Sequence, residues 1–293
     1  RAYLRDPVDL GLRPAAAGVL STLSAAALGR DLRDAAPATG AELGLTLGDA
    51  RTGRFTGSVL LERRYGLDQV VRHAPFDDAE PFRPVPPLEQ VDRAAVRLQY
   101  ERRGTLGPFA TRWAPRVEAG ATARLQDPPV GSDRLPVEGP WTAQGRETGG
   151  FARVVLDGTA TWSDARRRTG ITLRGAGGLN LGATPYQHLW YLGGRNTLPG
   201  HGLHAYLGDR VAVVDATVWR TLVPRLVRLR LFSAAGWAEL DSPPPAPTDP
   251  GLEPWTPAGT DGLRGSVGVG LGLLDGVVRL DYGLRTDGWD GVL

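Results

Sequence analysis

The chain has 293 residues, a formal net charge of +2, 40 Gly, 24 Pro and no Cys. The small net charge excludes the broad basic footprint of a nucleic-acid-binding protein, and the lack of Cys excludes disulfides, a thiolate nucleophile and Cys-based zinc sites. The many Gly and Pro residues argue against a helical bundle, and no apolar run approaches the roughly 18 residues that a transmembrane helix needs.

The first part of the chain has no clear pattern. Residues 1–14 are polar and irregular. The stretch Ala15–Leu28 is rich in Ala, which favours a helix, but Val19, Leu23 and Ala25 would share one face of a strand. We favour the strand.

From residue 41 onward, apolar and polar side chains alternate with a period of two. Leu43, Leu45 and Leu47, for example, alternate with more polar neighbours. This period is typical of β-strands with one apolar face. The alternating stretches are 41–47, 58–65, 95–102, 116–125, 151–162, 170–175, 212–220, 226–232, 265–274 and 277–285.

Two architectures explain such strands. A β-sandwich buries its apolar faces and leaves its polar faces in water, whereas a membrane barrel turns apolar faces toward lipid and polar faces toward a wet lumen. Outer-membrane barrels alternate short periplasmic turns with long extracellular loops, and this alternation is present here. The links are short at 48–55, 104–111, 164–168, 222–225 and 275–276, and long at 66–93, 126–149, 183–208 and 241–262.

The predicted fold is therefore all-β, an antiparallel up-and-down transmembrane β-barrel in residues 15–293. Residues 1–14 are interpreted as a periplasmic lead-in segment. About ten strands follow residue 41, or about eleven with the strand near residue 20. Because a bacterial barrel has an even number of strands and no open edge, we expect about twelve strands. The closing C-terminal strand, due after TDGWDG, is expected to be missing from this chain.

Loop 183–208 contains the most distinctive sequence, WYLGGRNTLPGHG (Trp190–Gly202), between two strong strand patterns. A long Gly-rich loop in such a place is more often functional than incidental. We therefore expect the functional residues of this chain to include residues of this loop.

Residues 190–293 resemble the C-terminal barrel region of the bacterial surface antigen superfamily, which contains BamA, TamA and the two-partner-secretion transporters. The matching features are the loop LGG-x-x-T-L-x-G, a strand that ends in Phe232–Gly236, and the strands GSVGVGLGLL and VVRLDYGLR. The resemblance implies an extracellular loop that folds back into the lumen. The motif residues are Leu192, Gly193, Gly194, Arg195, Thr197, Leu198, Pro199, Gly200 and His201 in the loop, with Phe232, Ala234 and Gly236 in the barrel wall.

Three positions depart from the family pattern. The family loop has an Arg-Gly-aromatic tip, and its Arg pairs with an Asp of the barrel wall. Pro199 and His201 stand at the tip here, and Ala234 stands at the Asp position. Loss of both partners is coherent, because losing one alone would leave an uncompensated charge in a confined lumen. Arg195 either replaces the missing Arg by reaching a wall carboxylate such as Asp215 or Asp281, or remains solvated.

His188, His201 and His204 could suggest a metal site. The loop is rich in Gly and the chain has only four His, so we interpret them as solvated loop residues and expect no metal or cofactor. The sequence has no GxSxG elbow, and we do not expect an enzyme.

The predicted lumen faces carry many charges. They hydrate and cross-link the barrel interior, or else they form an anion-selecting lining, since Arg outnumbers acid; we favour the first interpretation. The charges include Arg97, Glu101, Arg153, Asp157, Arg174, Asp215, Arg228, Arg230, Arg279, Asp281 and Arg285. Aromatic girdles lie near strand ends, and five tryptophans lie near the predicted ends: Trp162, Trp190, Trp219, Trp237 and Trp289. Trp219, however, falls on the polar, lumen-facing side of its strand by the period of two.

The expected function is protein insertion or translocation in the outer membrane of a Gram-negative-type bacterium, or anchoring of a missing N-terminal domain. The expected partners are outer-membrane lipid and unfolded outer-membrane or secreted client proteins, with no nucleic acid. A passive Arg-lined pore and a soluble β-sandwich binding module are the alternatives.

Overall fold

The computed structural model describes residues 1–9, 35–65, 90–124, 148–185, 188–203, 205–241, 258–274, 278–287 and 291–292. The stretch Ala15–Leu28, for which we favoured a strand, lies outside the described residues, as do His204 and Trp289. The described part of the chain contains no helix that is long and apolar enough to cross a membrane.

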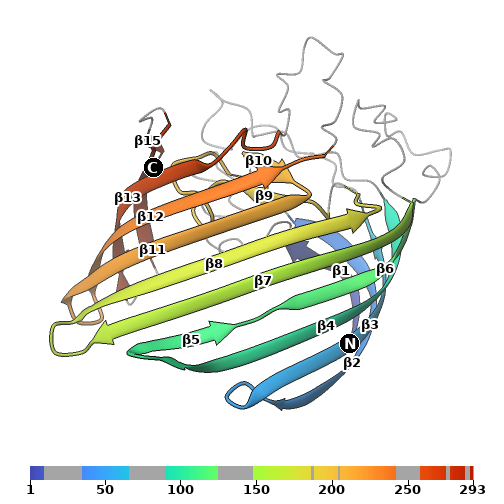
Figure 1. Ribbon diagram of the computed structural model, residues 1–293, viewed down its shortest axis with the longest axis horizontal. Coiled ribbons are helices and arrows are strands. Elements are labelled where there is room, and N and C mark those ends of the chain that lie inside the picture. The colour runs from blue at the N-terminus through green and yellow to red at the C-terminus, as the bar shows by residue number, and fades with distance from the viewer. Residues whose placement is uncertain are drawn as a thin grey trace, which may run out of the picture.

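Thirteen of the described strands form one antiparallel sheet, and their spatial order follows the chain. The sheet curls strongly, which gives it a convex and a concave face (Figure 1). The strands are β1 (Ala2–Asp9), β2 (Ala35–Asp49), β3 (Gly53–Arg64), β4 (Val91–Leu106), β5 (Phe109–Trp113), β6 (Arg116–Arg124), β7 (Gly149–Asp164), β8 (Thr169–Gly182), β11 (Arg210–Val223), β12 (Val227–Glu239), β13 (Arg264–Leu273), β14 (Val278–Arg285) and β15 (Gly291–Val292). This confirms the prediction of an all-β, antiparallel, up-and-down fold.

Strands β5 and β6 occupy a single position between β4 and β7. Ala114 and Pro115 interrupt the strand there, because Pro115 has no N–H to donate to the hydrogen-bond ladder of a sheet. The neighbouring strands compensate, because Tyr100 donates its N–H to the Pro115 carbonyl (3.0 Å) and Ala114 donates its N–H to the Asp157 carbonyl (2.8 Å). Counted by position, the described sheet therefore has about twelve strands. About twelve were expected for the complete barrel and about eleven in this chain.

The N-terminal edge of the sheet corrects one prediction. Residues 2–9 were expected to be irregular, but they form β1, which pairs with β2. In this pairing Pro7 lies opposite Pro37, and Pro is tolerated in strands chiefly near an edge. At the other edge, β15 pairs with β14, with Val292 opposite Gly283 and Gly291 opposite Leu284. Among the described strands no pairing joins β1 to β15.

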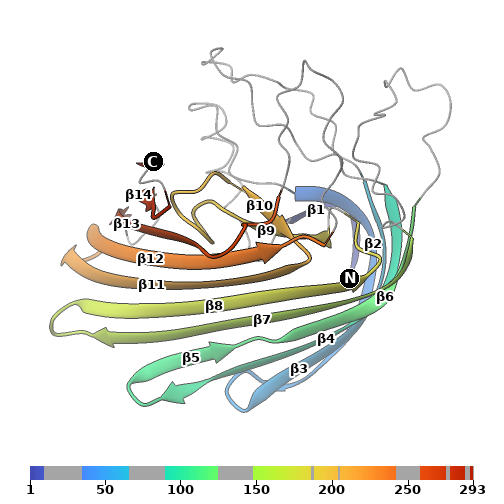
Figure 2. The same cartoon turned by 45° about the horizontal axis from the view of Figure 1, so that its top comes forward.

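The links between strands alternate in length as predicted. Two to four residues join β2 to β3, β4 to β5, β7 to β8 and β11 to β12, whereas the links after β1, β3, β6, β8 and β12 are much longer. The turns of β7–β8 and β11–β12 lie at the same end of the sheet, at the left of Figures 1 and 2. We call this the short-turn end.

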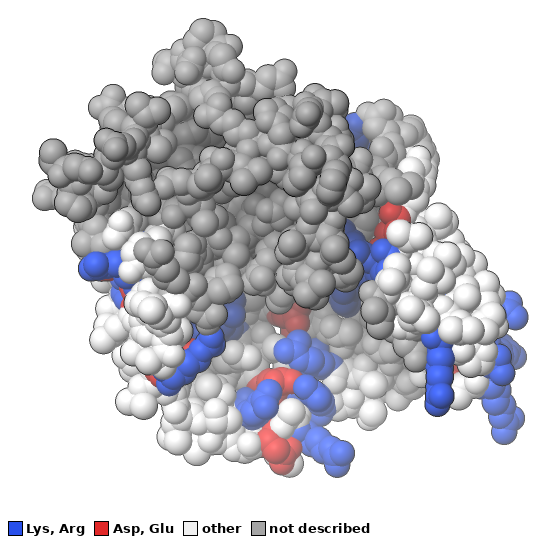
Figure 3. Space-filling model, turned by 180° about the vertical axis from the view of Figure 1, so that it is seen from behind, with Lys and Arg blue, Asp and Glu red and all other residues white. Residues whose placement is uncertain are grey.

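The two faces of the sheet have opposite polarity. Large apolar side chains project from the convex face into solvent, among them Leu43 (81% exposed), Val214 (60%) and Leu231 (56%). Charged side chains on the concave face are buried, including Glu62 and Arg93. Seen from behind, arginines and acidic residues lie together near the middle of the molecule, with uncharged surface beside them (Figure 3). A β-sandwich, the alternative fold, would have two sheets with buried apolar faces, so it is not the fold of these strands.

Strands β9 (Trp190–Leu192) and β10 (Tyr206–Gly208) form a separate two-stranded sheet. This small sheet lies inside the curve of the large one (Figure 2). Its side chains join the main apolar cluster of the described residues with concave-face residues of β7, β8, β11 and β12. The core of the molecule therefore sits between the central loop and the concave face.

Candidate functional site

The candidate site is loop 183–208 with the concave face beneath it. We call residues 183–208 the inner loop; residues 186, 187 and 204 of it lie outside the described part. Leu189, Trp190, Tyr191, Leu192 and Leu198 of the inner loop are at most 1% exposed. A loop of surface side chains would not be buried in this way, so the inner loop is packed inside the fold.

The start of the inner loop is fixed to β7 and β8. The carbonyl of His188 accepts hydrogen bonds from Arg153 Nη2 (2.9 Å) and Asn180 Nδ2 (3.0 Å). The Arg153 guanidinium also lies 4.3 Å from the ring centroid of Trp190, in a cation–π contact. These contacts involve concave-face residues of both strands, so the chain enters the interior at a defined point.

The middle of the inner loop makes apolar contacts with β11 and β12. Leu192 and Leu198 cluster with Val211, Val213 and Ala234. Gly236 of the wall motif lies directly under Leu198, because a Cβ at residue 236 would stand 3.2 Å from both Leu198 methyl carbons. The structure thus brings the predicted loop motif and wall motif together through an apolar contact. Phe232, the third wall residue, is buried on the same face of β12.

Glycines let the inner loop turn sharply and pack closely. Gly193 has φ +112°, and a Cβ there would stand 2.3 Å from the Gly202 carbonyl oxygen. Its N–H donates to Thr197 Oγ1, whose hydroxyl donates back to the Gly193 carbonyl (both 2.9 Å). Gly194 (φ +79°) continues the turn, and its N–H donates to the His201 carbonyl (3.0 Å). A substitution at these glycines would be strained.

The tip of the inner loop rests on β14. Pro199 and Gly200 approach the strand backbone so closely that a Cβ at Gly283 would stand 2.7 Å from Gly200 N and 2.8 Å from the Pro199 carbonyl carbon. Gly200 itself has φ +96°. Backbone-to-backbone packing of this kind requires Gly on both sides.

Arg195 forms the ion pair that was one of its two predicted alternatives. Its Nε donates to Asp281 Oδ2 (3.0 Å) and its Nη2 donates to the Arg279 carbonyl (2.9 Å). Asp281 also contacts the guanidinium groups of Arg279 and Arg230, the latter at 3.4 Å. The carboxylate of Asp281 is 6% exposed. One wall carboxylate therefore binds one loop arginine and two wall arginines.

The histidines correct a prediction, because the two that are described are buried and not solvated. His201 is 3% exposed and lies between the Gly265 carbonyl (3.1 Å from Nε2) and the Tyr206 hydroxyl (2.9 Å from Nδ1). Since a carbonyl only accepts, Nε2 must donate, and Nδ1 then accepts from the hydroxyl. Burial lowers the pKa of His201, which favours this neutral ring. Burial also lowers the pKa of His188, which is fully enclosed.

The remaining predicted lumen charges lie on the concave face and cross-link it. Arg174 Nε donates to Asp215 Oδ1 (2.8 Å) between β8 and β11. Arg228 stacks over the Trp219 ring at 4.7 Å, in agreement with the inward parity of Trp219. Arg285 is half-buried on β14.

Trp190 corrects the girdle prediction, because it is buried in the core.

One cluster of deeply buried charges, which joins β3, β4 and β6, was not predicted from the sequence. Arg93 Nη1 donates to Glu62 Oε1 (2.6 Å), and the same arginine contacts Glu118. Arg64 Nε also donates to Glu62 Oε1 (2.9 Å), and Tyr3 of β1 donates its hydroxyl to Glu62 Oε2 (2.9 Å). The signal was present, because Glu62, Arg64 and Arg93 continue the inward parity of their strands by a few residues.

The contacts described above anchor the inner loop to the concave face. No group of three or more His, Cys, Asp or Glu that could hold a metal ion occurs in the ranges described above. What the arrangement can do is hold a loop across the concave face from β7 to β14 and release it when the contacts break. Compared with known proteins, the chain matches no protein-family model and no curated protein.

Proposed function

We propose that this chain is a bacterial outer-membrane β-barrel whose lumen is closed by the inner loop, and that it assists the insertion or translocation of other proteins. The polarity of the sheet supports the membrane part of this proposal. Apolar side chains cover the convex face and charged ones the concave face, which is the arrangement of a barrel in lipid and the reverse of one in water. The alternation of short and long links supports it further.

The ion pair between Arg195 and Asp281 is the observation that carries the functional part. The resemblance to the surface antigen superfamily implies a loop arginine held by a wall aspartate. This chain lacks both residues at the family positions, yet it forms a loop-to-wall pair of the same kind four residues earlier in the loop and on a different strand. The Arg195–Asp281 pair is not a solvated surface contact, because the Asp281 side chain is only 6% exposed.

The same contacts suggest how the loop could act on a client protein. The inner loop links β7 and β8 to β14, which precedes β15 at one edge of the sheet. Release of Arg195 together with the loop tip would free β14 from the loop and let this edge move. An edge strand presents unpaired backbone groups that can pair with a strand from another chain. We infer that the edge is a lateral gate for a client strand.

Assisted folding of a client tests this function. The full chain is reconstituted in vesicles, a small urea-unfolded outer-membrane barrel is added, and its folding is followed by heat-modifiable gel mobility. The proposal predicts faster folding than in vesicles that contain an unrelated barrel of similar size. Equal rates in the two kinds of vesicle would contradict it.

A passive anion-conducting pore is the second candidate, and the charge around Asp281 favours it. Three arginines, Arg195, Arg230 and Arg279, contact this single carboxylate. A lumen with excess cationic groups attracts anions. Reversal potentials in asymmetric chloride solutions separate the two candidates, because a pore conducts anions in the wild type whereas a closed lumen conducts only after the loop is released.

A further inference from the structure

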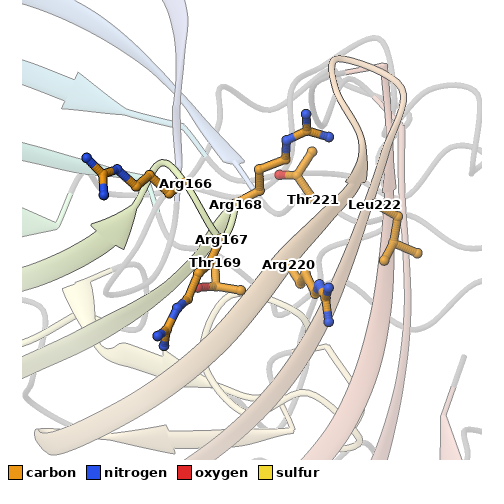
Figure 4. Close-up of a pocket in the computed structure, with 7 residues that line it drawn as sticks. All are labelled: Arg166, Arg167, Arg168, Thr169, Arg220, Thr221 and Leu222. Carbon is orange, nitrogen blue, oxygen red and sulfur yellow. The ribbon is translucent and has the colours of Figure 1, made fainter.

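An arginine-lined pocket lies at the short-turn end, between the β7–β8 turn and the end of β11 (Figure 4). Its cavity measures about 450 Å³. No acidic side chain lines it. The lining residues are Arg166, Arg167, Arg168, Thr169, Arg220, Thr221 and Leu222. A cavity lined by cations and hydroxyls is suited to an anion.

The backbone that carries the pocket is held in place. Thr169 and Arg220 are register partners across β8 and β11, and Thr221 donates its N–H to the Arg168 carbonyl (2.8 Å). Figure 4 shows Arg167 and Arg220 on the two sides of Thr169 with their guanidinium groups turned apart, whereas Arg166 and Arg168 point away from all three. Both arginine side chains are long, so rotation about their side-chain bonds would bring the two guanidinium groups and the hydroxyl onto one tetrahedral oxyanion.

Arg167 and Arg220 make few electrostatic contacts within the described part of the protein. Arg167 is 82% exposed and has only a 3.7 Å contact with Asp164. Within the described ranges, Arg220 makes no ion pair. Neither arginine is therefore needed to neutralise a buried carboxylate.

The pocket lies where the apolar convex surface ends. Arg220 shares the convex face of β11 with Val218, and Thr169 shares that of β8 with Leu173; both apolar side chains are close to half exposed. Leu222, also exposed, lines the pocket itself. A ligand in the pocket thus meets cationic groups on one side and an apolar surface on the other.

We propose that this pocket binds the phosphate of an anionic membrane phospholipid, with Arg167, Arg220 and the Thr169 hydroxyl on the phosphate and the acyl chains along Val218 and Leu173. The assignment rests on the proposed function, since it places the convex face in lipid. A free phosphate would gain nothing from the adjoining apolar surface, which favours the lipid as the source of the anion. The pocket would then fix the depth of the short-turn end in its leaflet.

Lipid retention by the full chain tests the proposal. The protein is purified in detergent, titrated with dioleoyl phosphatidylglycerol, and the bound lipid is counted by native mass spectrometry. The variant Arg167→Gln/Arg220→Gln removes both guanidinium groups. The matched control, Arg51→Gln/Arg102→Gln, removes two exposed arginines at the same end but outside the pocket. Parallel titrations use dioleoyl phosphatidylcholine, and inorganic phosphate as a competitor.

We expect the pocket variant to bind phosphatidylglycerol at least about tenfold more weakly than the wild type, with the control pair unchanged and phosphatidylcholine retained poorly by all three proteins. Equal weakening in both variants would overturn the proposal, because it would indicate only net charge. Displacement of the lipid by equimolar inorganic phosphate would also overturn it and indicate a free-anion site. The wild type is also mixed with phosphatidylglycerol vesicles and centrifuged through a density gradient; failure to float with the vesicles would instead overturn the proposed membrane location.

Discussion

A single added methyl group at Gly283 should loosen the inner loop. In Gly283→Ala, the new Cβ would stand 2.7 Å from Gly200 N and 2.8 Å from the Pro199 carbonyl carbon. Because a relaxed contact needs roughly 3.5 Å, the loop tip must retreat by about 0.8 Å. Overpacking of this size typically costs about 1–3 kcal/mol, which weakens docking of the loop by about 5-fold to 150-fold. Alanine itself is compatible with a strand.

Hydrogen exchange over residues 190–203 measures this docking. The N–H groups of Gly194 and His201 donate to carbonyls within the loop, and they exchange faster when the loop leaves its seat. Gly175→Ala is the matched control, because the nearest atom to its Cβ is a Val214 methyl at 3.9 Å. We expect faster exchange in Gly283→Ala only. Unchanged exchange in that variant, with an intact sheet, would refute the contact between the loop tip and β14.

Three further predictions concern other parts of the structure. Because burial lowers the pKa of His201, the undocked loop takes up a proton near pH 6.5, before the docked loop does. Docking should therefore be strongest above pH 6.5 and weaken as the pH falls below it. Bilayer conductance should rise as the pH falls through this window, and it should rise less steeply in His201→Gln than in the wild type. Arg93→Ala leaves Glu62 and Glu118 buried without this partner and should lower the free energy of unfolding by about 3–5 kcal/mol, measured by urea denaturation. The control Arg63→Ala removes one member of a solvent-exposed ion pair and should change the urea midpoint little. Val214→Arg should reduce folding into vesicles by about 2–4 kcal/mol if the convex face meets lipid, while equal yields of Val214→Arg and Val214→Leu would contradict a lipid-facing position.

The strands could be predicted from the sequence because their alternation is a local property. The inward residues Arg174, Arg230 and Asp281 and the outward residues Leu43 and Val214 were all placed on the correct face by parity alone. Link lengths gave the up-and-down order. The first strand was missed because Pro7 disguises its pattern, and Pro is permitted there only by its pairing near an edge.

The inner loop was harder to predict, since its structure depends on what it packs against. The Gly content of the loop led us to assign His188 and His201 to solvent, and the position of Trp190 near a strand end led us to assign it to a girdle. The resemblance implied a loop that folds into the lumen, but it did not specify the contacts. The loop folds onto the concave face, and the glycines allow close backbone contacts such as that of Gly200 with Gly283. Nothing local to either segment specifies that contact. The Arg195 pair could be proposed only as one of two alternatives, because the register of β14 against the loop is a tertiary property.

Single-channel conductance in planar bilayers tests most directly the claim that the Arg195–Asp281 pair holds the inner loop in a closed lumen. Arg195→Gln breaks that loop-to-wall pair, and Arg174→Gln breaks a wall-to-wall pair with Asp215 that does not involve the loop. The account predicts low conductance in the wild type and in Arg174→Gln, with frequent large openings in Arg195→Gln. Conductance in Arg195→Gln equal to that of the wild type, or equal increases in both variants, would contradict it.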